Sequence, residues 1–592
     1  MPLRTKFREE MEFLRRIGRE FAHENPQLAH FLGEEANDPD VQRLLEGVAF
    51  LTAKMSLKIE DDFPELTHSL LQLLWPNYLR PLPSMTMVRF EPMENEVTTR
   101  KRIHKGTPLL SRAVEGVQCQ FRTCKEVEVF PLRIAAVSDA HSQEKSILRV
   151  ELEPTSLDFV LSDMDCDRLE FHLSGDDTTA RNLYLWLARY LEQIRVDIDG
   201  TARHLRPDVL EFPGFSPEEA LLPYPRNVFD GYRILQEYFV FPQRFHFFAL
   251  NQLRPLWPRH KCQRVRLEFH FSRPMPAGTR LHNGDLSLYC APAANLFDHA
   301  AEPILLDGRS ADHRLSPAGL RPDAYEVFSI DEVSGWQNGA HGKPGRWLRT
   351  YHPFESLQHE IEHSQGRTAL YYRTRLENTH GSSGIQHRIA FVRADETEYI
   401  GESETVSLSL TCTNRDLPLS LGPGDICLGT LGAMETPNFV RFRNITAPTP
   451  SYRPVLDGEL HWSLISNLSL NYLSLLSVEP LRAVIRAYDF AALHDIRQAR
   501  ASHKRVAAIQ DASTSPADRL VRGLPVRGMR TSLRVDGAGF LCEGDLYLFC
   551  TVLSQFFSLY ASINSFHMLE AVNTSNHEHY SWPMQIGKQP LI

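Results

Sequence analysis

The hydrophobic pattern of this chain changes its period near residue 84, and this change restricts the possible folds more than any other feature. Before it, apolar residues recur at every third or fourth position, a spacing that places them on one face of an α-helix. From Met85 onward, beginning with MTMVRF, apolar and polar residues alternate, which is typical of a half-buried β-strand. The chain is therefore predicted to open with amphipathic helices and to continue as β structure.

Three helices are predicted before Pro76. Asp38 and Pro39 provide a capping side chain and a φ angle suited to the first turn of the second helix. Pro76 ends the third helix, because proline disfavours helical geometry in the residue before it. The apolar faces consist of Phe7, Met11, Leu14, Ile17 and Phe21, then of Val41, Leu44, Leu45, Val48, Leu51, Met55 and Ile59, and finally of Leu66, Leu70, Leu73 and Leu74.

Short β runs follow, and glycine-containing turns separate them. Turns are predicted at Lys105-Gly106 and at Glu115-Gly116, because glycine tolerates the positive φ that tight turns require. Further strands are predicted at 265–271, 286–292 and 325–333, with a loop at 334–345 and a helix at 182–194.

Residues 231–248, GYRILQEYFVFPQRFHFF, contain seven Phe or Tyr residues among eighteen. The pattern predicts a short helix before Pro242 and a strand after it, in which Phe245 and Phe247 alternate with polar residues. Burying one aromatic side chain contributes on the order of 1.5–3 kcal/mol, so exposing all seven would forfeit more free energy than many domains have in total. We expect most of these rings to lie in the core.

Two apolar helices are predicted near the C-terminal end, with a hairpin between them. The sequence TSLRVDGAGFLCEGDLYLF favours a hairpin that turns at Asp536-Gly537. The two helices carry Leu464, Leu468, Tyr472 and Leu475 in one, and Phe549, Leu553, Phe556, Tyr560 and Ile563 in the other.

These patterns predict an α+β protein of several domains, with amphipathic helices at both ends and β-rich domains between them. A chain of 592 residues is too long for a single core. The expected divisions are a helical region at 1–83, a first β-rich domain at 84–225, a mostly β domain at 226–400 and an α/β region at 401–592.

Composition and charge narrow the range of partners and compartments. A formal net charge of −10 disfavours nucleic acid, whose phosphates attract basic proteins. The first twenty residues lack the apolar core of a signal peptide, and no apolar run approaches the roughly 20 residues of a membrane span. Nine cysteines occur without a C-x-x-C pair, which indicates free and mostly buried thiols. We expect a cytoplasmic protein with neither a cofactor nor a metal.

The sharpest enzymatic signal is HEIEH at 359–363. On a helix His359 and His363 would share one face, where they could bind zinc while Glu360 acts as a general base. The extended zinc-peptidase pattern reaches Gly366, but Ala369 stands where its third ligand would be. Glu362 also places a charge where such helices pack against a core, so a solvated surface segment is the preferred interpretation.

Several blocks of the sequence resemble the TssF family, also called VasA or ImpG, of type VI secretion baseplate subunits. The blocks are DDFPELTHSLLQLLWPNYLRPLPSM, GYRILQEYFVFPQRFHFF, YCAPAANLF at 289–297, LTCTNRDLP at 410–418, LISNLSLNYLSLL and GDLYLFCTVLSQFFSLYASINSF. They keep their order from about residue 5 to 570, which makes the resemblance far more specific than the pentapeptide HEIEH.

The resemblance implies a non-enzymatic scaffold similar to the wedge proteins of contractile phage baseplates, with β-rich wings and a shared helical bundle. Two copies would join one TssG in a wedge, six wedges would surround the spike, and this baseplate would dock at the inner membrane. The implied neighbours are TssG, a second copy of TssF, TssK, TssE, the VgrG spike and the sheath. Partner-binding candidates are the helix residues Phe7, Met11, Leu14, Ile17, Leu44, Val48, Leu51, Leu468, Tyr472, Phe556 and Tyr560.

Two competing functions remain at this point. A zinc metallopeptidase built on HEIEH would hold one zinc ion and lose activity in Glu360→Gln. A carbohydrate-binding β protein is favoured by the aromatic residues and the β-rich stretches, and it would expose the rings of residues 231–248.

Overall fold

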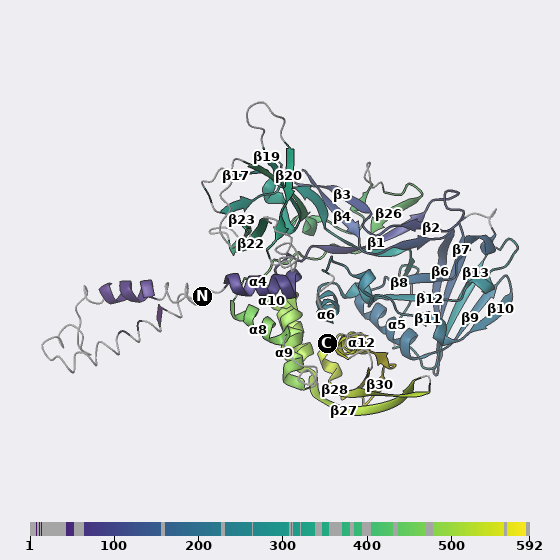
Figure 1. The fold of residues 1–592 in the computed structure, drawn as a ribbon. Helices are drawn as coiled ribbons and strands as arrows, with labels where there is room; N and C mark the ends of the chain where they lie inside the picture. Colours follow the sequence, from purple (N-terminus) through teal and green to yellow (C-terminus); the bar gives the residue numbers. More distant parts are fainter. Residues whose placement is uncertain are drawn as a thin grey trace.

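The computed structural model describes residues 7, 8, 11, 14 and 43–52, and residues 64–587 except 156–159, 226–230, 263, 277, 307–309, 311, 320, 338–345, 355–369, 379–383, 394–403, 430–435, 457, 469–476, 522 and 562–564. Two units have their own hydrophobic cores. We call residues 297–413 the wing and the other described residues from 64 to 587 the body. Figure 1 shows the wing at the upper left and the strands of the body at the centre and right.

The body contains a six-stranded sheet built from three distant parts of the sequence. Its order is β25-β3-β4-β15-β1-β26, so β1 pairs with β15 on one side and with β26 on the other. The strands are β1 (Met85–Pro92), β3 (Pro108–Val114), β4 (Val117–Thr123), β15 (Cys290–Ala294), β25 (Ile426–Leu428) and β26 (Val440–Asn444). The short strands β2 (Lys101–Ile103) and β5 (Val127–Val129) pair beside it.

Two further sheets complete the β part of the body. One has the order β10-β9-β13-β7-β6 and the other the order β11-β12-β8-β14. Their strands are β6 (Leu132–His141), β7 (Ser146–Pro154), β8 (Leu169–Leu173), β9 (Leu191–Ile198), β10 (Thr201–Leu205), β11 (Leu210–Glu211), β12 (Phe247–Leu250), β13 (Val265–Phe271) and β14 (Leu286–Leu288). Helix α5 (Asp177–Arg189) begins at Asp176, whose carboxylate accepts hydrogen bonds from the amides of Thr178 and Thr179.

The wing consists of two sheets around a separate core. One contains β16, β24, β19 and β20, with β17 also paired to β24, and the other has the order β18-β23-β22-β21. The strands are β16 (Phe297–Ala300), β17 (Ile304–Leu306), β18 (Asp312–Leu315), β19 (Glu326–Gln337), β20 (Arg346–Thr350), β21 (His352–Pro353), β22 (Leu370–Asn378), β23 (Ile385–Arg393) and β24 (Glu404–Thr413). Among the described strands, those of the wing pair only with one another.

Helices from both ends of the sequence meet on one side of the body. Helix α4 (Pro64–Leu74) packs against α8 (Gly458–Leu468), which contacts α9 (Val478–Tyr488). Trp75, at the end of α4, makes edge-to-face contacts with Tyr232 and Tyr488, which stack on each other. The aromatic residues of distant segments therefore fix this helical layer, which is visible below the wing in Figure 1.

The C-terminal part adds a mixed sheet and a central helix. The sheet has the order β27-β28-β29-β30, with β31 also paired to β29. Its strands are β27 (Ile509–Val521), β28 (Leu524–Val535), β29 (Phe566–Asn573), β30 (His579–Ser581) and β31 (Gln585–Ile586). The helices of this part are α10 (Phe490–His494), α11 (Ile496–Ala507) and α12 (Glu543–Tyr560), and α6 (Gly231–Val240) comes from the middle of the chain. Helix α12 packs against α5, α6 and β29.

Many predicted elements are confirmed. The α+β class holds, α4 ends at Leu74 directly before Trp75-Pro76, and β13 covers the predicted 265–271. The turn at Glu115-Gly116 joins β3 to β4 with φ values of 50° and 81°, so both residues have the positive φ expected in such a turn. The strand expected at 325–333 is present as part of β19.

Four predictions were wrong in detail. The expected hairpin at Asp536-Gly537 does not form, because Asp536 caps the turn η11 (Gly537–Gly539) and residues from Glu543 onward are helical. The hairpin is instead β27–β28, closed by the pair Val521 and Leu524 with Gly523 at φ 83°. Residues 191–194 belong to β9, because Ile194, Val196 and Ile198 alternate into the core.

The other two differences each concern a few residues at the end of an element. Strand β19 continues through residues 334–337, where a loop was expected, and pairs there with β20 and β24. Phe245 lies in the turn η6 (Pro242–Phe245), so β12 begins only at Phe247.

Sheet pairing also crosses the expected domain divisions. Strands β7, β8 and β9 lie before residue 225, yet they pair with β12, β13 and β14 beyond it. Strand β24 begins after residue 400 and completes the wing through β16 and β19.

Candidate functional site

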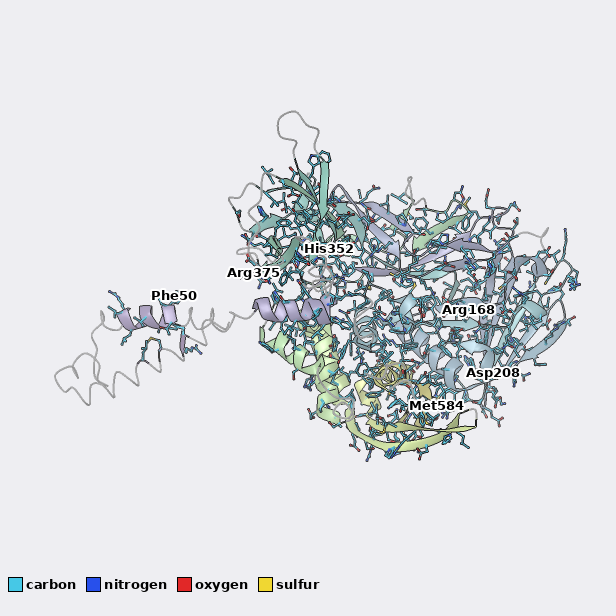
Figure 2. The ribbon with its side chains drawn as sticks, in the orientation of Figure 1. Phe50, Arg168, Asp208, His352, Arg375 and Met584 are labelled. Carbon is cyan, nitrogen blue, oxygen red and sulfur yellow. The ribbon has the colours of Figure 1, made fainter. Side chains whose placement is uncertain are left out.

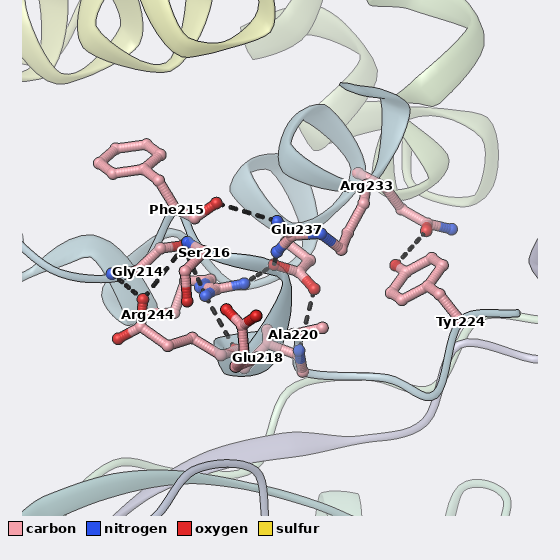
Figure 3. A network of polar contacts seen from close by, with 12 residues as sticks. Gly214, Phe215, Ser216, Glu218, Ala220, Tyr224, Arg233, Glu237 and Arg244 are labelled. Carbon is pink, nitrogen blue, oxygen red and sulfur yellow. Dashed lines mark hydrogen bonds and ion pairs between the residues drawn. The ribbon is translucent and has the colours of Figure 1, made fainter. Parts of the chain in front are cut away.

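The aromatic block 231–248 contains three members of a buried ion network centred on Glu237, and Figure 3 shows the network. Arg233 lies one helical turn before Glu237 on α6, with 3.3 Å between Nη1 and Oε2, and Arg244 pairs with the same oxygen. All three side chains are buried. The other oxygen of Glu237, Oε1, accepts a hydrogen bond from the amide of Leu221 at 2.9 Å. One carboxylate therefore holds two guanidinium groups and a loop together.

The two arginines extend this network to the loop at 214–220. Arg233 Nη2 donates to the carbonyl of Phe215 at 3.1 Å, and Arg244 Nη2 donates to the carbonyls of Gly214 and Glu219 at 2.6 and 3.0 Å. Burial, together with the charge of Arg233, lowers the pKa of Arg244 to about 9.

The rings around this network are core residues, as predicted. Tyr232, Tyr238, Phe241, Phe245, Phe247 and Phe248 are all buried, and Phe239 is partly buried against the same core. This burial contradicts a carbohydrate-binding role for the stretch, which would need exposed rings.

A second buried carboxylate, Asp545 of α12, contacts three other helices. Arg181 Nη1 of α5 lies 2.8 Å from Oδ1, and Arg505 Nη2 of α11 lies 3.6 Å from Oδ2. The hydroxyl of Tyr238 on α6 also donates to Asp545 Oδ1, at 3.3 Å. Burial raises the pKa of this tyrosine, so the hydroxyl keeps its proton and remains a donor. Asp545 therefore fixes α12 against α5, α6 and α11.

The connections into and out of the wing are joined by two buried asparagines. Asn414 N donates to Asn295 Oδ1 at 2.6 Å, and Asn295 Nδ2 donates to Asn414 Oδ1 at 2.9 Å. The main chain of Gln120 in β4 bonds to both side chains. Its N–H donates to Asn414 Oδ1 at 3.0 Å, and its carbonyl oxygen accepts from Asn295 Nδ2 at 2.7 Å. We call Asn295, Asn414 and Gln120 the wing clasp, because it ties both crossings to the six-stranded sheet.

Exposed apolar side chains occur on the helices. The helix at 43–52, which we call the arm helix, stands away from the body, and Figure 2 labels Phe50 on it. Its exposed fractions are 68% for Leu44, 41% for Val48, 47% for Phe50 and 59% for Leu51. The helical layer of the body also exposes Leu74, Trp462, Leu493 and Ile496. Exposed apolar groups gathered on helices mark surfaces that a partner would cover.

The predicted partner-binding residues have several different locations. Leu44, Val48 and Leu51 are exposed on the arm helix. Met11 is buried, whereas Phe7 and Leu14 are half-buried. Phe556 is fully buried in its own chain, where its ring packs against Tyr232 and Phe557, so it has no surface for a partner. Four candidate side chains lie outside the described part of the chain: Ile17, Leu468, Tyr472 and Tyr560.

The zinc site and the reactive thiols considered from the sequence have no counterpart among the described residues. HEIEH at 359–363 lies outside the described residues. Within the described part of the chain, no group of three His, Cys, Asp or Glu side chains is arranged to hold a metal ion. Seven of the nine thiols are buried, Cys542 is half-buried and Cys427 is exposed, as predicted for free cysteines. Burial raises the pKa of Cys290 and of Cys412 to about 12, which disfavours a nucleophilic thiolate.

Across the described segments, no helix combines the length and the apolar character that crossing a bilayer requires.

Together these features define a class of protein: a β-rich scaffold subunit held by buried polar networks, with helices exposed for assembly. The whole sequence supports a narrower assignment. Residues 2–589 match the family model described as type VI secretion system, TssF, and the chain therefore belongs to this family. A relative from Pseudomonas aeruginosa, type VI secretion system component TssF1, is 29% identical over an alignment 629 residues long, which covers 99% of each chain.

Two solved structures resemble the fold. A chain from the TssK-TssF-TssG baseplate subcomplex, determined by cryo-electron microscopy, is 29% identical with a TM-score of 0.76, and the match covers 92% of this chain and 98% of that one. A chain from the baseplate complex of the type VI secretion system is 26% identical with a TM-score of 0.64, and both chains are covered completely.

The sequence blocks that carried the family resemblance supply the polar networks. Arg233, Glu237 and Arg244 come from one block, whereas Asn295 and Asn414 come from two others. Sequence reasoning missed all of these roles. The signal for Glu237 was available, because an arginine and a glutamate four residues apart within an aromatic run indicate a buried pair.

Proposed function

We propose that this chain is a structural wedge subunit of the type VI secretion baseplate, acting by assembly rather than by catalysis. The observation that carries the proposal is the structural match, over 92% of this chain, to a chain solved within a TssK-TssF-TssG baseplate subcomplex. The buried networks around Glu237 and Asp545 support it, because they join helices and a loop from distant parts of the sequence within the body.

The partners of this chain follow from that assignment. TssG and TssK homologues are its proposed neighbours, because the matched chain was solved in a TssK-TssF-TssG baseplate subcomplex. The wider assembly adds a second copy of this chain, TssE, the VgrG spike and the sheath, in the cytoplasm at a baseplate docked to the inner membrane. Rearrangement of the wedge contacts helps couple the baseplate to sheath assembly and contraction.

The arm helix is the surface proposed for the shared helical bundle. Leu44, Val48 and Leu51 recur at spacings of four and three, so they share one face, and each is exposed. A face of this kind gains free energy when a partner helix covers it, on the order of 25 cal/mol for each Å² of apolar surface. Phe7, Met11, Leu14 and Ile17 of the preceding segment belong to the same proposed bundle, together with Leu468, Tyr472 and Tyr560 from the C-terminal helices.

A double substitution on the arm helix tests this proposal. Leu44→Glu with Leu51→Glu should abolish copurification with a tagged TssG homologue while leaving the thermal unfolding of the body unchanged. Leu419→Glu is the matched control, since Leu419 is 51% exposed but lies on η9 (Leu417–Ser420), away from the arm. Equal recovery of TssG with both variants would contradict the role of the arm helix.

A further inference from the structure

A cavity of about 260 Å³ lies between the wing and the body. Its body side is formed by the end of α4 and the turn η2 (Pro76–Tyr78), and its wing side by strands β19, β22 and β23. One hydrogen bond, from Gln72 Nε2 to Thr374 Oγ1 at 2.8 Å, spans the two sides. Figure 2 shows Arg375 of β22 beside α4, at the same border. We call this cavity the wing cleft.

Charge in the wing cleft is unbalanced. Arg80 is the one permanently charged side chain among the described residues that line it, and no Asp or Glu is among them. Asp331 on β19 is near enough for its field to act on Arg80, but its carboxylate accepts hydrogen bonds from Ser329 at 2.8 Å and Thr411 at 2.7 Å. A buried or half-buried charge normally has a direct partner of opposite sign, which Arg80 lacks in the described part of the chain.

The guanidinium of Arg80 is nevertheless held in a fixed orientation. Its Nη1 donates to Asn77 Oδ1 at 2.9 Å, and Asn77 Nδ2 is itself bonded to the carbonyl of Pro223 at 3.1 Å. The Cζ atom lies 5.2 Å from the ring centroid of Phe328, which comes from the wing. Asn77 of the body and Phe328 of the wing therefore each contact the guanidinium group of Arg80.

These contacts leave the Nε–Nη2 edge of Arg80 available. Neither nitrogen has a hydrogen-bond partner among the described residues, and neither is sealed from solvent. This edge presents two parallel N–H groups, the arrangement that binds both oxygens of a carboxylate. Burial also lowers the pKa of Arg80, against the opposing field of Asp331.

We propose that the wing cleft binds a carboxylate from an acidic side chain of a partner subunit, on the Nε–Nη2 edge of Arg80. The proposal rests on the proposed baseplate function and names one contact within it. The volume favours a side chain over a larger ligand, because pockets for drug-sized molecules span roughly 300–1,000 Å³. Since Asn77 and Phe328 orient the guanidinium from opposite sides of the border, a bound carboxylate would also hold the wing in one position relative to the body.

The test compares three variants of the full chain in complex with coexpressed TssG and TssK homologues. Arg80→Gln removes the charge, and Arg80→Lys keeps the charge but removes the two-nitrogen edge. Arg441→Gln is the matched control, because Arg441 is exposed and lines a different cleft. Circular dichroism and thermal unfolding first establish that each variant is folded.

We expect Arg80→Gln to raise the dissociation constant by at least about tenfold, Arg80→Lys to raise it less, and Arg441→Gln to leave it unchanged. An unchanged constant for Arg80→Gln would overturn the partner carboxylate while leaving the baseplate role intact. If the wild-type chain formed no complex at all, the proposed function would fail instead.

A second arm separates a partner side chain from a free small acid. The thermal unfolding of the isolated chain is measured with succinate in millimolar excess and with sodium chloride at equal ionic strength. Stabilisation of the wild type but not of Arg80→Gln supports a carboxylate site. If this occurs while Arg80→Gln binds the partners normally, a free acid is the ligand and the partner source is overturned. No stabilisation together with normal partner binding would overturn the site altogether.

Discussion

At the scale of single residues, two buried carboxylates each hold two arginines. Glu237 holds Arg233 and Arg244, and Asp545 holds Arg181 and Arg505. Such a group adds little net stability compared with apolar residues, but loss of one member leaves a buried charge without compensation. The carboxylates are therefore the positions where a small chemical change has the largest expected effect.

Replacing Glu237 with Gln should destabilise the fold by about 3–5 kcal/mol, because both arginines would keep their charges in the core. Urea unfolding of the isolated chain measures this change. Glu479→Gln provides the comparison, since Glu479 pairs with Arg482 at 2.7 Å but is mostly exposed, and an exposed pair is worth about 0–1 kcal/mol. Equal effects of the two substitutions would contradict the assigned role of Glu237.

Buried histidines make stability depend on pH. Burial lowers the pKa of His172 to about 3, with a smaller contribution from Lys125, and it lowers the pKa of His567 to about 4. Both are neutral in the folded chain, whereas the unfolded chain binds protons below the ordinary value of 6.5. Their contribution is therefore complete above that value and is lost as the pH falls toward 3–4.

Unfolding free energy should consequently fall by about 1.4 kcal/mol per buried histidine between about pH 7.5 and pH 5.5. In His172→Gln this pH dependence should become weaker by the contribution of one histidine. Urea titrations of the wild type and of this variant at the two pH values measure the difference, and an equal pH dependence of both proteins would contradict the role of His172.

At the scale of elements, close backbone approach sets the position of α12. A Cβ added at Gly544 would lie 2.1 Å from the carbonyl oxygen of Arg181, so only glycine lets α12 begin this near to α5. Gly544→Ala should therefore lower the free energy of unfolding by at least about 1–3 kcal/mol, as overpacking does.

Gly47 of the arm helix has open space around it, and Gly47→Ala should stabilise that helix by about 0.5–1 kcal/mol. Thermal unfolding and helix content measure the two changes.

The wing clasp should control exchange at the junction between wing and body. Asn414→Ala removes the acceptor for the amide of Gln120, so hydrogen exchange at Gln120 should become faster. Amides in the centre of β13 should exchange as before, because that strand lies in another sheet. Unchanged protection at Gln120 would show that the clasp does not hold the crossings.

The elements predicted correctly from the sequence are those that residues next to one another in the chain determine. Glu115-Gly116 forms a turn because of its backbone preferences, and α4 ends before Pro76 for a steric reason. The hairpin at β27–β28 was missed because Asp536-Gly537 is the stronger local turn signal, yet Asp536 bonds within η11 instead. Asn295 and Asn414 lie 119 positions apart, and their pairing depends on tertiary structure that no local pattern encodes.

At the scale of the whole molecule, the body, the wing and the arm helix have different roles in the proposed assembly. The body has one continuous core from Leu71 to Trp582, the wing has its own core, and the arm helix presents apolar residues outward. A body with one continuous core, an attached wing and an uncovered helix suits a subunit that is completed by its partners.

The mass of the complex with a TssG homologue tests the central claim most directly. The two proteins are coexpressed, and size-exclusion chromatography with light scattering gives the molar mass. The account predicts a stable complex with two copies of this 67.8 kDa chain for one TssG. A chain that elutes alone as a 67.8 kDa monomer, with TssG in separate fractions, would contradict it.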